Sequence, residues 1–491
     1  MAENEAANKT ELKDQAARDI LVNVLNRNLL VEAAAGTGKT SGMVRRMVEL
    51  LRSGTIRNMR NMAAVTFTRK AAAELKSRFR IKLEECVRSE TGPTRASLEI
   101  ALQNLEQCFI GTIHSFCGRL LRERPVEADI DPTFIELDEN GDAIVRKEAW
   151  NEYCSRIFAE DSDGVLTRLY ELDLRLQDLE ASFLRFTDYP DVDIWPVPEE
   201  KPDFKIFDPV REKIFEYVSY MKSLATRLPD EWGSDGLIPE YQRLPRVVSH
   251  YGALEQPADV AAVLEYFDKG SKLVQKSWTQ NGQFTKDEAK SEQARWDEFR
   301  SKVVKPAQKK WREWRYGPTI EVMKQAQKVY DEMRHSRGQL NYTDLLMRAA
   351  ELLRNKPHVR TYFRNRFTHL LVDEFQDTDP IQAEVILLLT ASRRDENDWR
   401  KVVPTPGSLF VVGDPKQSIY RFRRADIVTY NDVKNAIEKR GTRQGSVIEL
   451  SSNFRTVKSV VSWVNRVFEP NDDDPCEFTS AMTRFGKKAS A

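Results

Sequence analysis

Cysteine and histidine are scarce in this sequence, and their scarcity excludes several kinds of site. The 491 residues include five histidines and five cysteines, with no C-x-x-C pair and no cysteine–histidine cluster at metal-ligand spacing: Cys86, Cys108, Cys117, Cys154 and Cys476. We therefore expect neither a disulfide framework nor structural zinc. Such cysteine usage is typical of a reducing, cytoplasmic compartment.

The sequence also lacks an excess of either charge and any long apolar run. Lysine plus arginine number 76 and aspartate plus glutamate number 76, so a nucleic acid would have to be held by local basic patches. No apolar run reaches the roughly eighteen residues of a membrane-spanning helix, and residues 1–14 do not resemble a secretory signal. We expect residues 1–11 to form a disordered lead. A hydrophobic content of 41% can support roughly two to four domains.

The most informative stretch is a strand, a loop and a helix in succession. Residues 28–32 (NLLVE) predict a short buried strand, residues 33–40 (AAAGTGKT) a small-residue loop, and residues 41–51 a helix. The helix has an apolar stripe at helical spacing, outside which Arg45, Arg46 and Glu49 fall: Met43, Val44, Met47, Val48 and Leu51.

This order is that of a phosphate-binding P-loop. Glycine at positions 36 and 38 lets backbone N–H groups approach an anion, and the following helix N-terminus adds partial positive charge. Lys39 would reach the β and γ phosphates of ATP, and the Thr40 hydroxyl would hold Mg²⁺. The predicted nucleotide-binding loop comprises Ala33, Ala34, Ala35, Gly36, Thr37, Gly38, Lys39 and Thr40. Ala33 replaces the first glycine of the general pattern, and the alternative for the loop alone is a chance glycine-rich turn.

Short apolar strands alternate with amphipathic helices on both sides of this loop. We expect further strands at residues 62–68, 369–372, 409–412 and 447–450, and a strand and turn at residues 108–116 with a helix from residue 117. The alternation predicts an α/β fold with a parallel sheet, which binds ligands at the carboxyl ends of its strands.

Residues 131–339 show no such alternation. This region is rich in charge and holds seven of the nine tryptophans, so it predicts a mainly helical inserted domain. Its segment 305–315 (KPAQKKWREWR) interleaves basic and aromatic residues, which could grip a phosphate backbone and stack bases. The alternative is a helix that buries its tryptophans and solvates its lysines.

Two acidic residues end the predicted strand at residues 369–372. Asp373 would hold Mg²⁺, directly or through water, and Glu374 would polarise the water that attacks the γ-phosphate. Acidic pairs at strand ends are common, but this one occurs together with a P-loop. After the strand at residues 409–412, a polar amide could sense the γ-phosphate while the following arginines and aromatics face another ligand.

Six phrases in this order resemble the UvrD/Rep group of superfamily 1 DNA helicases, and within it the AddA and RecB type of helicase–nuclease motor subunit. They are AAAGTGKT, TFTRKAAAELKSR, GTIHSFCGRLLRERPVEADIDP, LLVDEFQDTDPIQAE, LFVVGDPKQSIYRFRRAD and SSNFRT. The resemblance implies a RecA-like P-loop NTPase domain in two parts, residues 1–130 and 340–445. It also implies a helical accessory insertion at residues 131–339 and the start of a second RecA-like domain at residues 446–491.

The resemblance also implies roles for single residues. Gln15 would read the adenine edge, Phe454 would stack on adenine, and Arg455 would contact the γ-phosphate. Gln376 and Gln417 would couple the γ-phosphate to the DNA site. The residues expected along a single-stranded DNA track are Thr66, Phe67, Thr112, His114, Tyr420 and Phe422.

The function expected from the resemblance is ATP- and Mg²⁺-dependent 3′ to 5′ movement on DNA, in repair or recombination, with a nuclease or helicase partner subunit. An arginine from a complete second domain contributes about 10³ to 10⁵ in rate to phosphoryl transfer. The chain could therefore be an incomplete motor, or an ATP- and DNA-binding regulatory module. The phrases at residues 373–378 and 417–426 disfavour a P-loop kinase or small GTPase, and no nuclease cluster is found.

Overall fold

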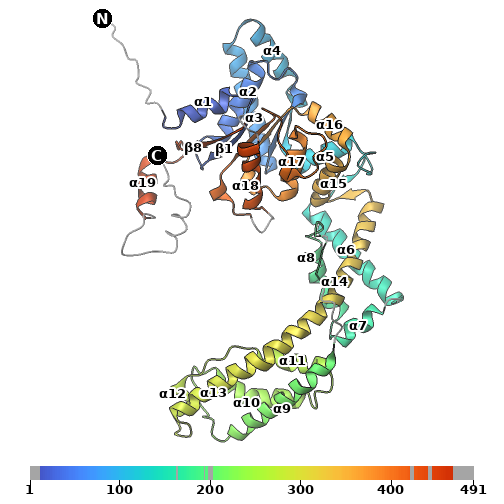
Figure 1. Cartoon of the computed structure of the whole chain (residues 1–491), viewed down its shortest axis with the longest axis vertical. Helices are drawn as coiled ribbons and strands as arrows, with labels where there is room; N and C mark the ends of the chain where they lie inside the picture. Colours follow the sequence, from blue (N-terminus) through green and yellow to red (C-terminus); the bar gives the residue numbers. More distant parts are fainter. Residues whose placement is uncertain are drawn as a thin grey trace. The chain divides into compact units, whose positions relative to one another are not determined.

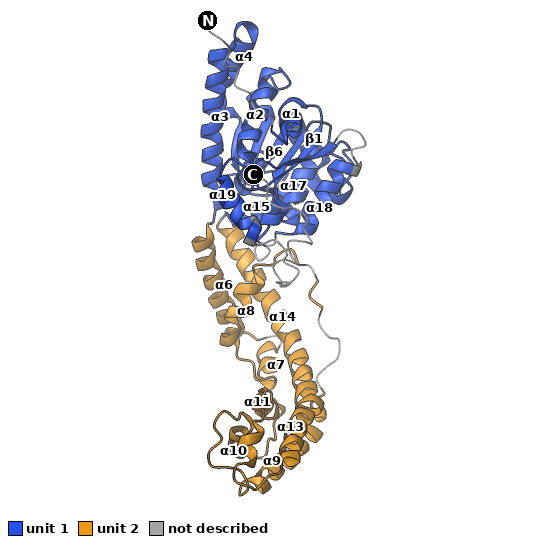
Figure 2. Ribbon diagram, turned by 90° about the vertical axis from the view of Figure 1, so that its left-hand side faces the viewer, with its two compact units in different colours: residues 1–137, 338–491 blue, residues 138–337 orange. Residues whose placement is uncertain are grey.

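The computed structural model describes residues 12–161, 164–192, 194–196, 203–420, 425–440 and 445–467. The chain divides into two compact units: unit 1 is residues 1–137 with 338–491, and unit 2 is residues 138–337 (Figure 2). Unit 2 is thus inserted into the sequence of unit 1. In the described part of the chain, no helix combines the length and apolar character needed to cross a membrane.

Unit 1 is built on a six-stranded sheet in the order β3-β2-β6-β7-β1-β8, with every neighbouring pair parallel (Figure 1). Its strands are β1 Asn28–Ala33, β2 Met62–Thr66, β3 Phe109–Thr112, β6 His369–Val372, β7 Leu409–Gly413 and β8 Gly445–Leu450. The central strands are short hydrophobic runs buried on both faces, as parallel sheets require. The predicted α/β fold with a parallel sheet is confirmed.

Helices cover both faces of this sheet, and successive strand residues contribute to different cores. Leu30 packs into the core that contains α5, α15 and α17, whereas Leu29 and Val31 pack with α2 and α3. The helices of unit 1 are α1 Gln15–Asn23, α2 Lys39–Arg52, α3 Arg69–Ser89, α4 Gly92–Gln103, α5 Ile113–Glu123, α15 Tyr342–Asn355, α16 Pro357–Arg366, α17 Pro380–Thr390, α18 Ile427–Asn435 and α19 Lys458–Val467. A two-stranded parallel ladder joins β4 Ile135–Glu136 to β5 Gln339–Leu340.

Two boundaries differ from those expected from the sequence. The strand at residues 445–450 pairs with β1 at the edge of this sheet, so it does not begin a second sheet at residue 446. Helix α5 begins at Ile113, not at residue 117, because the Thr112 hydroxyl accepts a hydrogen bond from the Ser115 N–H and caps the helix. His114 therefore lies on the first turn of a helix.

Arg46 is buried on α2, although the sequence pattern places it outside the apolar stripe. Its guanidinium donates hydrogen bonds to the carbonyl oxygens of Leu21 (2.7 Å) and Val24 (3.0 Å), and it stacks on the Phe410 ring. These carbonyls lie at the C-terminus of α1, where helices leave acceptors without partners. Burial lowers the pKa of Arg46 to about 10, so the side chain remains cationic at neutral pH.

Unit 2 is helical, and its tryptophans form much of its core. The helices are α6 Glu139–Ala159, α7 Val165–Glu171, α8 Glu180–Phe186, α9 Phe207–Leu224, α10 Leu237–His250, α11 Pro257–Phe267, α12 Gln275–Thr279, α13 Lys286–Phe299 and α14 Lys305–Ser336. Trp311 and Trp314 of α14 are buried against Phe207 of α9. The segment 305–315 is thus a helix that buries its tryptophans, and these indoles are not accessible to DNA bases.

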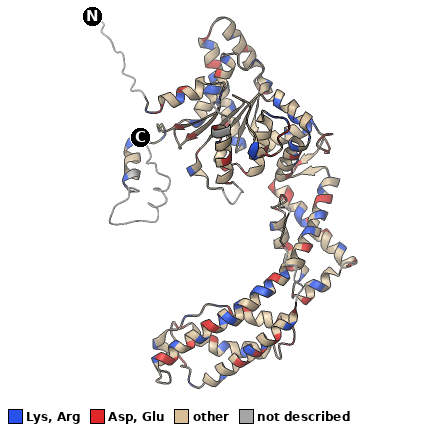
Figure 3. Ribbon diagram, viewed as in Figure 1, with Lys and Arg blue, Asp and Glu red and all other residues tan. Residues whose placement is uncertain are grey.

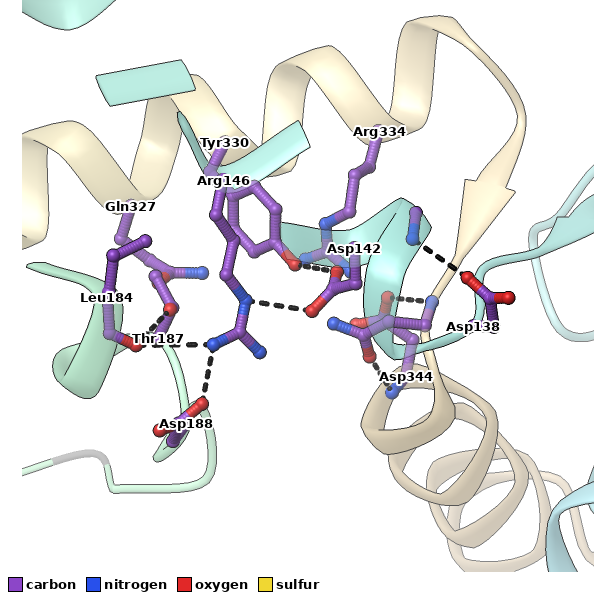
Figure 4. Close-up of polar contacts among 12 residues, drawn as sticks. Asp138, Asp142, Arg146, Leu184, Thr187, Asp188, Gln327, Tyr330, Arg334 and Asp344 are labelled. Atoms are coloured by element: carbon purple, nitrogen blue, oxygen red, sulfur yellow. Dashed lines mark hydrogen bonds and ion pairs between the residues drawn. The ribbon is translucent and has the colours of Figure 1, made fainter. Parts of the chain in front are cut away.

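A polar network ties three helices of unit 2 together (Figure 4). The Asp142 carboxylate of α6 accepts hydrogen bonds from Arg146 Nε (2.8 Å) and from the Tyr330 hydroxyl of α14. Arg146 also donates to the carbonyl oxygen of Leu184 on α8 (3.2 Å) and pairs with Asp188. Buried charges are stable when they are paired and hydrogen-bonded in this way, and the network fixes α6, α8 and α14 relative to one another.

Candidate nucleotide and DNA site

The predicted site residues gather at one edge of the parallel sheet. The P-loop follows β1, Phe67 follows β2, Asp373 follows β6, Asp414 follows β7 and Ser451 follows β8. Because all six strands are parallel, these positions lie at the carboxyl edge, where open α/β sheets bind their ligands.

The P-loop requires glycine at two positions. Gly36 and Gly38 adopt left-handed φ angles of 81° and 88°, and Gly38 precedes the first residue of α2. A Cβ on Gly36 would lie 2.5 Å from Asn453 Oδ1, so a side chain there would also collide with the segment after β8. The Thr37 hydroxyl donates to the carbonyl oxygen of Ala34 (2.8 Å) and closes the turn. The loop thereby directs an anion site to the N-terminus of α2.

Lys39 joins this loop to the acidic pair after β6. Its Nζ lies 3.0 Å from Glu374 Oε2, although the two residues are 335 positions apart in the sequence. Gln376 Nε2 donates to the same carboxylate oxygen (2.8 Å). Glu374 has a φ of 52°, a left-handed conformation that is rare for a residue with a side chain and is often found at functional sites.

Asp373 continues β6 and is buried beside Glu374. Its N–H donates to the carbonyl oxygen of Val65 (2.9 Å), and its Oδ1 accepts the Glu374 N–H (3.0 Å). Burial, and secondarily the Glu374 charge, raises the pKa of Asp373 to about 6. The same two causes raise the pKa of Asp377 to about 6. Three carboxyl groups thus share a poorly solvated region that favours a cation.

Replacing Asp373 with asparagine is expected to stabilise the protein above about pH 6 when no divalent metal is added. Since folding raises this pKa, the folded chain binds more protons than the unfolded chain between about pH 4 and pH 6. The contribution of Asp373 to stability therefore falls as the pH rises through that window. The gain could reach about 3 kcal/mol. Denaturant unfolding with EDTA at pH 5 and pH 8 measures it.

Asp395→Asn is the matched control, because Asp395 is a surface carboxylate paired with Arg393. It should produce little change at either pH. Equal stability of wild type and Asp373→Asn at pH 8 would contradict the electrostatic account of the buried carboxyl groups.

The donor set suits Mg²⁺. Thr40 offers a hydroxyl on the first turn of α2, and Asp373 offers a carboxylate. Within the described ranges, His, Cys, Asp and Glu side chains do not form a group of three that could hold a metal by themselves. Mg²⁺ typically takes one or two protein oxygens and completes its octahedron with water and phosphate, so the pair fits a metal that arrives with a nucleotide.

A chain of hydrogen bonds connects Glu374 with the end of β7. Gln376, which donates to Glu374, accepts the Asp414 N–H at its Oε1 (2.9 Å). Asp414 in turn accepts a hydrogen bond from Gln417 Nε2 (2.7 Å), and the Ser418 hydroxyl donates to the carbonyl oxygen of Gln376 (3.0 Å). Both glutamines proposed to couple ATP to DNA therefore belong to one connected set.

The predicted base-binding residues are brought to the loop unequally. The Phe454 N–H donates to the carbonyl oxygen of Gly36 (2.8 Å), and the Phe454 side chain is 60% exposed. Arg455 also lies over the loop, since its Cβ would be 2.7 Å from a Cβ on Gly36. Gln15, by contrast, donates to Asp19 within α1 (2.9 Å).

The predicted DNA-track residues form two aromatic pairs. Phe67 stacks on Tyr420 with ring centroids 5.4 Å apart, and His114 lies 5.1 Å from the Tyr342 ring. Burial, partly offset by the Glu136 charge, lowers the pKa of His114 to about 4, so the imidazole is neutral at physiological pH.

The remaining predicted DNA-track residues have mainly local partners. Thr66 is buried and its hydroxyl donates to the carbonyl oxygen of Thr68 (3.1 Å), whereas Thr112 caps α5. Phe422 falls outside the described residues, as do residues 468–491.

Several residues of this region were not predicted. Asp14 and Arg18 form an ion pair beside the P-loop, Asp414 joins the two glutamines, and Tyr342 stands beside His114. The sequence offers a partial signal for one of them, because the aspartate directly follows the predicted strand at residues 409–412. Asp14 and Arg18 look like ordinary polar residues at the start of a helix.

Comparison with known proteins agrees with this geometry. Residues 14–438 match the family described as UvrD/REP helicase N-terminal domain. Proteins named as the AddA subunits of ATP-dependent helicase/nucleases are similar over most of the chain: that of Listeria welshimeri is 28% identical over 486 residues, and that of Enterococcus faecalis is 27% identical over 511 residues. These alignments cover 90% and 91% of this chain, and the chain spans 38% of the length of each relative. The chain belongs to the UvrD/REP helicase family.

Proposed function

We propose that this chain binds ATP with Mg²⁺ at the P-loop and uses ATP hydrolysis to move along single-stranded DNA, as part of a DNA helicase. The observation that carries the proposal is the 3.0 Å contact between Lys39 and Glu374. It places the phosphate-binding loop and the acidic pair within the reach of one triphosphate, as phosphoryl transfer requires.

The contact also suggests how the site responds to its substrate. The γ-phosphate would compete with Glu374 for the Lys39 ammonium, because both partners are anionic. Release from Lys39 would leave the Glu374 carboxylate to orient and deprotonate a water molecule. Thr40 and Asp373 would hold the metal ion, which supplies neutralisation of the developing phosphate charge.

The hydrogen-bonded glutamines provide a route from this chemistry to DNA. Gln376 touches Glu374, and Gln417 lies three positions before Tyr420, whose ring stacks on Phe67. A change in the partners of Glu374 would therefore reach an aromatic pair at the sheet edge. Aromatic rings bind bases without regard to sequence, which suits movement along any strand.

The partner and the direction follow from the family and its relatives. Movement 3′ to 5′ is the direction expected of this family. The relatives are named as components of helicase/nucleases, which supports a role in DNA repair or recombination beside a nuclease partner. Basic and acidic side chains are interspersed along the helices (Figure 3), so DNA contact would depend on local arginines and aromatics and less on a general field.

The direct test is ATP hydrolysis measured with and without single-stranded DNA, for the chain alone and with a candidate partner protein. The proposal predicts Mg²⁺-dependent hydrolysis that single-stranded DNA increases. Nucleotide binding without hydrolysis under every condition would favour a regulatory ATP- and DNA-binding module instead. Absence of ATP binding would contradict both functions.

A further inference from the structure

A buried ion pair at the start of α1 contacts both sides of the nucleotide site. Arg18 donates to both carboxylate oxygens of Asp14 (3.1 and 2.8 Å), and its Nη2 also donates to the carbonyl oxygen of Thr37 in the P-loop (3.0 Å). The Asp14 carboxylate accepts the N–H groups of Ser451 (2.9 Å) and Ser452 (3.0 Å), which follow β8. The pair therefore links the P-loop to the segment after β8.

Asp14 is satisfied almost entirely by these groups. It also accepts the Ser452 hydroxyl (2.7 Å). Burial alone would raise the pKa of Asp14, but hydrogen bonds from Arg18, Ser452 and Ser451 together hold it well below its ordinary value. The carboxylate is thus ionised throughout the physiological range, and the linkage is permanent at working pH.

The same arginine lies over the aromatic residue expected to receive the base. The Arg18 guanidinium carbon is 4.9 Å from the centroid of the Phe454 ring, within the range of a cation–π contact. A Cβ on Gly38 would lie 3.7 Å from Arg18 Nη1 and 4.0 Å from Phe454 Cδ2. The loop glycine, the guanidinium and the ring therefore meet at one point.

We propose that the Asp14–Arg18 pair is a positioning device for base recognition, which fixes the Phe454 ring beside the P-loop so that a nucleotide binds better than a bare triphosphate. This inference rests on the proposed ATP site. Asp14 anchors the backbone that carries Phe454, and Arg18 orients the ring. With the ring already oriented, a base would stack on it at a smaller entropic cost.

The test compares two ligands that differ in the base. Mg²⁺–ATP and Mg²⁺–tripolyphosphate are titrated calorimetrically into wild type, Arg18→Ala, Arg18→Lys and Asp14→Asn. A stacked base contributes roughly 1–3 kcal/mol, or about five- to 150-fold in affinity. We expect Arg18→Ala to weaken ATP binding by about tenfold, within that range, and to leave tripolyphosphate binding within about twofold. Arg18→Lys keeps the charge but not the planar fork, and should fall between wild type and Arg18→Ala.

Two further variants separate this role from a general loss of structure. In a Phe454→Ala background, Arg18→Ala should have little further effect on ATP affinity, because the arginine acts through the ring. Arg45→Ala, on the exposed side of α2, is the matched arginine control and should leave both affinities unchanged. Unchanged melting temperatures would show that the variants are folded.

The failures of this inference and of the proposed function are distinguishable. Equal weakening of ATP and tripolyphosphate by Arg18→Ala, or no weakening of either, would overturn the positioning role while leaving the ATP site intact. Failure of wild type to bind either ligand would overturn the ATP site and the positioning role together.

Discussion

Replacing Lys39 with alanine is expected to remove ATP hydrolysis and most ATP affinity. The ammonium is the group of the P-loop that would contact the β and γ phosphates, and a charge-assisted hydrogen bond contributes about 1.5–3 kcal/mol. Loss of one or two such bonds corresponds to roughly ten- to 10⁴-fold in affinity. Calorimetric titration with Mg²⁺–ATP, paired with a phosphate-release assay, measures both effects.

The matched control for this variant is Lys309→Ala, which removes a largely exposed lysine of α14 in unit 2. It should keep wild-type ATP affinity and hydrolysis. Wild-type hydrolysis by Lys39→Ala would contradict the assignment of the loop after β1 as the triphosphate site.

Replacing Glu374 with glutamine is expected to separate binding from hydrolysis. The amide retains the size of the side chain and can still meet Gln376, but it cannot accept a proton from water. General-base catalysis contributes about 10²–10⁴-fold, so single-turnover hydrolysis should fall by that factor. ATP affinity should stay equal or rise, because Glu374 no longer competes as an anion for the Lys39 ammonium.

Glu99→Gln on α4 is the corresponding control, since Glu99 makes an exposed ion pair with Arg95. It should hydrolyse ATP like wild type. A Glu374→Gln variant that hydrolyses ATP within a few-fold of wild type would show that another group activates the water.

The sheet could be predicted from the sequence because its strands are local hydrophobic runs. Residues 28–32, 369–372 and 409–412 each form the expected strand, and the apolar stripe of α2 is buried as its spacing predicts. The family could be recognised for a similar reason, because its motifs are contiguous phrases. These features depend on neighbours in sequence.

Features that depend on distant contacts were not predicted. Arg46 is buried because it meets the carbonyl oxygens at the end of α1, and residues 445–450 join the sheet because they pair with the edge of β1 that β7 leaves open. Asp14 finds its partners 437 and 438 positions away. Local periodicity carries no information about such contacts, so the structure was needed to find the ion pair that supports the base-binding residue.

The most direct test of the central claim is a crystal structure of the chain with Mg²⁺ and a non-hydrolysable ATP analogue. We predict the triphosphate on the loop at residues 33–40, the ion in contact with the Thr40 hydroxyl and on the Asp373 side, and Lys39 Nζ moved from Glu374 to the phosphate oxygens. A triphosphate bound elsewhere, or Lys39 still paired with Glu374 and no phosphate on the loop, would contradict the account.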